Sequence, residues 1–362
     1  MKLPGRALRP LHAFRSPAAL SRLALASIVA NIGIVATGGA VRLTGSGLGC
    51  PTWPECSEGS YTPTGEHGMY ELVEFGNRML TFVVGLIAAA GLLAALAQRR
   101  RRPAAVLPAV LVFVGIPAQA VVGGVTVLTD LNPWVVGCHF LVSMAMITAA
   151  YVFWRRASDR PDGAPVPAPL RHLAVATAVV SAGVLVLGTV VTGSGPHAGD
   201  AGARRNGLDP ESIAQLHTDA VFLLVGLSVG LWIGLRAAGA DRAARAAAVL
   251  VGVELAQGLI GFVQYFTRLP AVLVGLHMIG ASLVWLATVA VLAEMRRRPA
   301  PPGATVPAQH PAPSDTYPTL ARITSANRSA DPAAVRKNSD GSVSSNSISS
   351  GSPEPGTRST RA

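Results

Sequence analysis

Three histidines lie inside apolar stretches of this chain, and their spacing suits chemistry at a porphyrin iron. His139 and His277 each lie about six residues into such a stretch, which is roughly 9 Å along a helix. His217 lies about four residues into another. Ionisable side chains are costly inside a bilayer and mark functional positions by default. Two imidazoles at one depth on facing helices, as His217 and His277 would be, supply the axial ligands of six-coordinate haem iron. The alternative interpretation is that the histidines only hydrogen-bond between helices.

A second set of polar residues lies where the first half of the chain would hold a matching site. Asn77 corresponds to His217 at an offset of 140 and faces His139 in that scheme. Because asparagine is a poor axial ligand, we do not expect iron held by two histidines here. Glu74, one helical turn earlier, favours a pocket in which a porphyrin reacts, whereas a solvated loop carboxylate is the alternative. Four arginines near the outer boundary suit haem propionates, or they extend to the membrane interface. They are Arg78, Arg204, Arg205 and Arg268.

The elements that carry these residues are repeated. Residues 118–139 match residues 256–277 without a gap at an offset of 138, and Gln119/Gln257 and Gly123/Gly261 are among the identical pairs. Each copy predicts a helix, a turn and a second helix with a histidine near its start. A repeat unit of four helices gives both halves the same orientation across a membrane. We expect Gln119 and Gln257 to hydrogen-bond across helices, and Glu254 to need a partner.

The composition predicts an all-α integral membrane protein. Half of the residues are apolar and 14% are charged, as is typical of polytopic helical proteins. The predicted fold has eight transmembrane helices in two pseudosymmetric four-helix bundles of the same orientation. The spans are 20–41, 78–98, 104–129, 133–154, 170–192, 213–235, 243–266 and 271–295.

The net charge of +11 comes largely from arginines in short loops, which set topology rather than bind nucleic acid. Their distribution predicts a multi-pass protein of the cell membrane with both termini in the cytoplasm. The predicted regions are a cytoplasmic N-terminus 1–19, a first half 20–154 with an outer loop 42–77, a cytoplasmic linker 155–169, a second half 170–297 and a disordered cytoplasmic tail 298–362.

The chain has three cysteines. Cys50 and Cys56 lie in the outer loop and form a plausible disulfide if that loop faces an oxidising compartment, with two unpaired thiols as the alternative. Cys138, beside His139, is read as a small buried residue.

The residues between 37 and 78 resemble the haem A synthase family. The motifs are TGGAVRLTGSGLGCPTWP at 37–54 and EFGNR at 74–78, and the similarity extends over about 20–297. The resemblance implies an enzyme, an oxidoreductase acting on haem O. It converts the C8 methyl group to the formyl group of haem A through a hydroxymethyl intermediate, with oxygen from water, for cytochrome c oxidase biogenesis.

The resemblance also implies site residues. It assigns haem b, as an electron-transfer cofactor, to His217 and His277, and the substrate haem to His139 and the Glu74 region. It gives the cysteine pair of the outer loop a functional role. The family pattern is Glu-x-x-His-Arg, so this chain is a type with Asn77 in place of the first intramembrane histidine. Either His139 is the sole protein ligand of the substrate haem, or His67 of the outer loop folds toward the haem as a second ligand.

Two other functions fit parts of the pattern. A di-haem electron-transfer protein of the cytochrome b type would bind haem equally in both halves, against which Asn77 argues. A transporter would have helices broken at mid-depth. The expected partners are haem O, membrane lipid, a haem O synthase and cytochrome c oxidase assembly factors, with no nucleic acid. The sequence leaves open whether the chain forms a homo-oligomer.

Overall fold

The computed structural model describes residues 16–158 and 165–295, and these residues form long helices joined by loops. Eight of the helices are long and apolar enough to cross a membrane, which confirms the predicted all-α, eight-span fold. They are α2 (Pro17–Leu43), α3 (Gly68–Ala97), α4 (Val106–Leu128) after a short 3-10 turn η1 (Pro103–Ala105), α5 (Pro133–Ala157), α6 (Ala168–Ser194), α7 (Pro210–Ala237), α8 (Asp241–Phe266) and α9 (Ala271–Met295). Residues 1–15, 159–164 and 296–362 lie outside the described residues, and they include His12 and the whole of the predicted tail 298–362.

Three helices begin with a capping side chain followed by proline. The side chain accepts a hydrogen bond from a main-chain N–H of the first turn, and proline suits the first helical position because it has no N–H to satisfy. The three pairs are Ser16–Pro17, Asn132–Pro133 and Asp209–Pro210. These three helices, α2, α5 and α7, therefore start at a defined residue.

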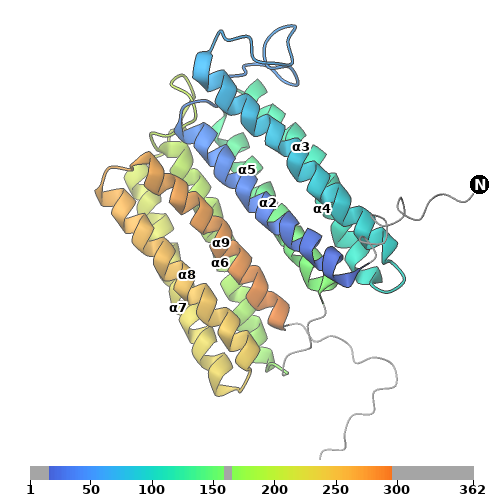
Figure 1. The fold of residues 1–362 in the computed structure, drawn as a ribbon. Coiled ribbons are helices and arrows are strands. Elements are labelled where there is room, and N and C mark those ends of the chain that lie inside the picture. Colours follow the sequence, from blue (N-terminus) through green and yellow to red (C-terminus); the bar gives the residue numbers. More distant parts are fainter. Residues whose placement is uncertain (1–15, 159–164, 296–362) are drawn as a thin grey trace, which may run out of the picture. The chain divides into compact units, whose positions relative to one another are not determined.

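The helices pack in two groups of four (Figure 1). In the first, α2 packs against α3 and α5, and α4 lies against α3 and α5; in the second, α6 packs against α7 and α9, and α8 lies against α7 and α9. The groups meet through α2, α5, α6 and α9. The indole Nε1 of Trp285 on α9 crosses this seam and donates to the carbonyl of Met144 (3.0 Å) and to Oγ1 of Thr148 (2.9 Å) on α5. The predicted pseudosymmetry of the two bundles stays a prediction.

The sequence repeat is also a local structural repeat. In the α4–α5 turn, the N–H of Leu131 donates to the carbonyl of Thr126 (2.9 Å), and in the α8–α9 turn the N–H of Leu269 donates to the carbonyl of Gln264 (2.7 Å). Leu131 and Leu269 have positive φ angles of 55° and 59°, which is uncommon for bulky residues. The two copies therefore turn in the same way and start α5 and α9 at equivalent positions.

Helix α3 begins at Gly68, ten residues before the predicted span at 78. The last ten residues of the predicted outer loop 42–77 are therefore already helical, and how far that loop extends outside a membrane stays a prediction. Apolarity alone did not indicate these first turns of α3 because they carry Glu71 and Glu74. Both carboxylates are buried beneath the preceding loop rather than solvated.

The interpretation of Cys138 as buried is wrong. Its side chain is exposed on the outer surface of α5, although the neighbouring His139 points inward. In a membrane, an outward surface is as apolar as the core, so hydrophobicity does not indicate which way a small residue faces.

Candidate functional site

One cavity of about 1340 Å³ runs through the bundle, and all eight long helices line it. Ligand pockets usually measure roughly 300–1,000 Å³, so this cavity has room for more than one small ligand. Its lining is largely apolar and includes all three intramembrane histidines that the sequence singled out, His139, His217 and His277. Glu74 and Asn77 line it as well, whereas His67 does not.

Each of the three histidines packs against a glycine of the preceding helix. A Cβ atom at Gly123 would lie 3.3 Å from Cε1 of His139, and one at Gly261 would lie 3.2 Å from Cε1 of His277. Gly188 on α6 has the same relation to His217 on α7, at 3.3 Å. We call these three places the glycine notches. A side chain in any of them would press on the imidazole, so glycine leaves room for the ring in its present position.

The imidazoles of the second half fit axial ligation of a haem. The Nδ1 atoms of His217 and His277 are buried and make no hydrogen bond. The ring of His217 lies near the main chain of Val184, and that of His277 near the main chain of Gln257, without the geometry of a bond. The two rings are close enough for their charges to interact.

A bare metal ion would need more ligands than these two rings provide. Among the described residues, no group of three histidine, cysteine or acidic side chains is placed so that it could hold a metal ion. A porphyrin supplies four donors of its own and needs only two axial ligands from the protein. The donor set therefore fits haem better than a simple metal centre.

A glutamine on the preceding helix contacts the main chain of each repeated histidine. Nε2 of Gln119 donates to the carbonyl of His139 (3.2 Å), and Nε2 of Gln257 donates to the carbonyl of His277 (2.7 Å). Gln119 also donates to Oγ of Ser143 (2.6 Å). The predicted hydrogen bonds across helices are thus confirmed, and they tie each histidine to the helix that carries its notch.

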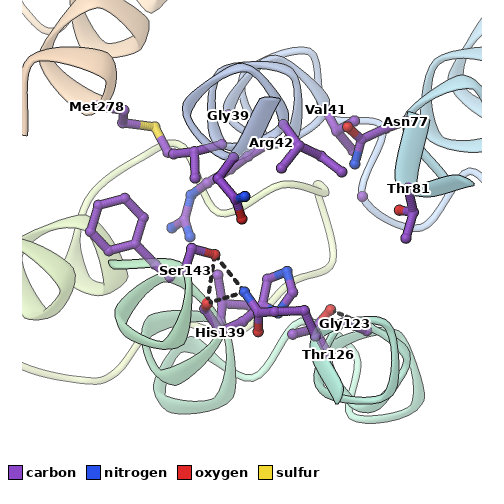
Figure 2. A pocket seen from close by; sticks show the side chains of 18 of the residues that line it. Gly39, Val41, Arg42, Asn77, Thr81, Gly123, Thr126, His139, Ser143 and Met278 are labelled. Atoms are coloured by element: carbon purple, nitrogen blue, oxygen red, sulfur yellow. Dashed lines mark hydrogen bonds between the residues drawn. The ribbon is translucent and has the colours of Figure 1, made fainter. Parts of the chain in front are cut away.

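The first half differs from the second at Asn77. His139 extends from α5 toward the space that Asn77 and Thr81 face from α3 (Figure 2). Oδ1 of Asn77 accepts a hydrogen bond from Oγ1 of Thr37 on α2 (2.8 Å). The amide is therefore already bonded to its neighbour, and His139 is the one histidine among the described residues that lines this part of the cavity.

Glu74 joins the disulfide loop to the cavity wall. Its Oε2 accepts from the main-chain N–H of Cys50 (2.7 Å), and its Oε1 pairs with Nη2 of Arg78 (2.6 Å). The remaining donors of Arg78 reach the carbonyls of Cys50, Thr52 and Glu55. All three guanidinium nitrogens of Arg78 thus donate hydrogen bonds within the protein. These bonds are an alternative to the predicted contact with a propionate.

The predicted disulfide between Cys50 and Cys56 is present, and both residues are buried. Glu71, which the sequence reading passed over, is fully buried beside it. Its carboxylate accepts from the main-chain N–H groups of Thr64 (2.6 Å) and Gly65 (2.8 Å). The loop is therefore closed both covalently and through a buried carboxylate.

Comparison with known proteins gives this arrangement a family. Residues 21–289 match the COX15-CtaA family, described as cytochrome oxidase assembly protein. The chain belongs to the COX15-CtaA family. Proteins named heme A synthase are similar over shorter stretches. That of Geobacillus kaustophilus is 28% identical over 148 residues, which is 38% of this chain and 46% of the relative. That of Exiguobacterium sibiricum is 32% identical over 144 residues, 39% and 48% of the two chains. Each match thus spans less than half the length of the curated relative.

Two polar residues in this COX15-CtaA chain line the cavity without a role predicted from the sequence. Glu254 on α8 is buried, and its Oε1 accepts from Oγ of Ser228 on α7 (2.8 Å) while Oε2 has no partner. Arg42, in the last turn of α2, also lines the cavity. A signal for Arg42 was available, because it is a charged residue inside a predominantly apolar stretch.

Proposed function

We propose that this chain is a haem A synthase, an enzyme of the cell membrane that oxidises haem O. The observation that carries the proposal is the set of three histidines in glycine notches around one cavity, with asparagine where a fourth ligand would be. Family membership and the similar proteins named heme A synthase support it. The reaction would convert the C8 methyl group and one water molecule to a formyl group, four protons and four electrons through a hydroxymethyl intermediate, with haem b as the electron-transfer cofactor that takes up the electrons.

In the second half, His217 and His277 would hold haem b, which accepts and passes on single electrons when bound. Two imidazole donors suit a haem that would supply electron transfer there. Gly188 and Gly261 keep the rings in place, and the hydrogen bond from Gln257 to the His277 carbonyl fixes α8 against α9. The protein would thereby hold the cofactor in a single orientation.

In the first half, His139 would be the protein ligand of the substrate haem. Asn77, bonded to Thr37, leaves the opposite side of the porphyrin without a histidine. Glu74 lines the same space, and we propose that it accepts a proton from the attacking water or stabilises positive charge at the C8 carbon. Its bonds to Cys50 and Arg78 orient the carboxylate for either task.

The remaining predictions follow from this function. A haem O synthase would supply the substrate, and cytochrome c oxidase assembly would consume the product. We propose that the disulfide end of the bundle, where Cys50 and Cys56 lie, faces outward and that both termini are cytoplasmic.

The test is pigment analysis of membranes from cells that make haem O but no haem A. Expression of this chain should produce haem A on extraction and chromatography. Glu74→Gln should abolish haem A while haem b remains bound, whereas Glu66→Gln, an exposed loop carboxylate, should behave as the wild type. Wild-type membranes with haem b but no haem A would instead favour the di-haem cytochrome b interpretation.

A further inference from the structure

The guanidinium of Arg42 extends from the last turn of α2 into the cavity (Figure 2). Its Nε donates to the carbonyl of His197 (2.6 Å), and its Nη2 donates to the carbonyl of Thr192 (3.0 Å). Two of its five N–H groups are thus bonded within the described residues, and Nη1 makes no hydrogen bond there. An arginine fork has five donors, so three remain available to a ligand.

Arg42 has no acidic partner among the described residues. It takes part in no ion pair with a carboxylate, and the charged group that acts on it is the like charge of Arg205. A cation that is largely removed from water is costly unless an anion pairs with it. Arg42 lines the cavity, and the exposed Arg205 is near enough for the two like charges to repel, so this part of the cavity favours an anion.

The loop 195–206 holds this site in shape. A Cβ at Gly199, whose φ is +103°, would lie 3.7 Å from Cγ of Arg42, so the loop backbone packs directly on the arginine stem. The carbonyl of Gly199 accepts from the N–H of Gly47 (2.8 Å), and Nη2 of Arg205 donates to the carbonyl of Pro196 (2.8 Å). The stem and its backbone acceptors are therefore fixed before any ligand binds.

The site lies at the seam between the two halves. Thr192, which accepts from Arg42, is one helical turn after Gly188, the notch of His217. The next residue on α2, Leu43, lies 3.2 Å from a Cβ built at Gly275, two residues before His277. On α5, His139 lines the same cavity. Arg42 is thus placed between the porphyrin sites proposed for the two halves.

We propose that Arg42, supported by the nearby charge of Arg205, binds a carboxylate of a bound porphyrin, that is, a haem propionate. The inference rests on the proposed function for its porphyrin but names a contact that this function does not require. Arginine matches a carboxylate through two parallel N–H···O bonds, which lysine does not reproduce. Arg78, whose donors are engaged within the protein, would then hold the loop while Arg42 holds the ligand.

The test compares haem with its dimethyl ester, in which both propionates are uncharged. Full-length protein produced under haem limitation is titrated in detergent, and binding is followed by the low-spin Soret band. Wild-type protein should bind haem about 10- to 100-fold more tightly than the ester, the range expected for hydrogen bonds between charged groups. Arg42→Gln should lose this preference, Arg205→Gln should reduce it, and Arg204→Gln, an exposed neighbour, should retain it.

Two backgrounds identify which porphyrin supplies the carboxylate. In His139→Ala the preference reports on the haem of the second half, and in His277→Ala on that of the first. If Arg42→Gln abolishes the preference for haem over the ester in one of these backgrounds, the result supports the anion site. It also shows which of the two porphyrins Arg42 contacts. An Arg42→Gln protein that folds, binds haem and still discriminates against the ester as the wild type does would overturn the inference.

Arg42→Lys is a second variant that keeps the test decisive if Arg42→Gln does not fold. It keeps the positive charge and should fold with a weakened preference, and an unchanged preference would count against the bidentate contact. Failure of the proposed function is separable, because wild-type protein that makes no haem A but discriminates against the ester keeps the anion site. If the wild type makes haem A but Arg42→Gln still prefers haem to the ester, the inference about Arg42 is wrong while the proposed function stands.

Discussion

Gly261→Ala should weaken haem b binding, because the added methyl group presses on the imidazole of His277 while the histidine itself is unchanged. The added Cβ would lie 3.2 Å from Cε1 and 3.7 Å from Nδ1 of His277, whereas carbon atoms pack without strain at about 3.5–4.0 Å. The ring must therefore move by about 0.3–0.8 Å, and functional geometry tolerates about 0.5 Å. Overpacking costs about 1–3 kcal/mol. If that cost falls on the ligand geometry, haem affinity should drop about 5- to 150-fold.

Gly252→Ala is the matched control on the same helix. Nothing lies within 4 Å of a Cβ at Gly252, and the residue does not line the cavity. Alanine should therefore stabilise α8 there by about 0.5–1 kcal/mol and leave haem binding unchanged. Haem titration of detergent-solubilised protein measures both variants, and thermal unfolding checks the stability. Equal haem affinity in Gly261→Ala and Gly252→Ala would refute the role assigned to the notches.

Three further predictions concern the loop, the seam and the repeated glutamine. Glu71→Gln should cost about 1–3 kcal/mol, because an amide group would face the Thr64 N–H that the carboxylate accepts, and limited proteolysis should cut the loop sooner; unchanged cleavage would contradict this. Trp285→Phe should cost about 1–3 kcal/mol through the loss of two hydrogen bonds across the seam, seen as a lower unfolding temperature without a change in the haem spectrum. Gln257→Leu should remove the bond to the His277 carbonyl and shift the midpoint potential of haem b; an unchanged potential would show that the bond does not position the ligand.

The sequence predicted the parts of the fold that depend on apolarity and repetition. Eight spans follow from runs of apolar residues, and the offset of 138 places His139 and His277 in equivalent local structure. The disulfide also followed, because two cysteines in one short loop have few other partners. These predictions need only composition and spacing, not the direction in which a side chain points.

What the sequence did not predict depends on contacts between distant segments. The helical turns before residue 78 were not predicted because they carry Glu71 and Glu74, whose burial depends on the loop that covers them. The hydrogen bonds of Arg78 to the loop did not follow from the sequence, because its carbonyl acceptors lie more than twenty residues away along the chain. The orientation of Cys138 was wrong because lipid and protein core are equally apolar.

The glycine notches bear on which substitutions the chain can accept. At Gly123, Gly188 and Gly261 even the smallest added side chain would press on an imidazole, whereas apolar positions elsewhere in a core accept other apolar residues of similar volume. Three residues without a side chain are therefore as constrained as the three histidines that they contact.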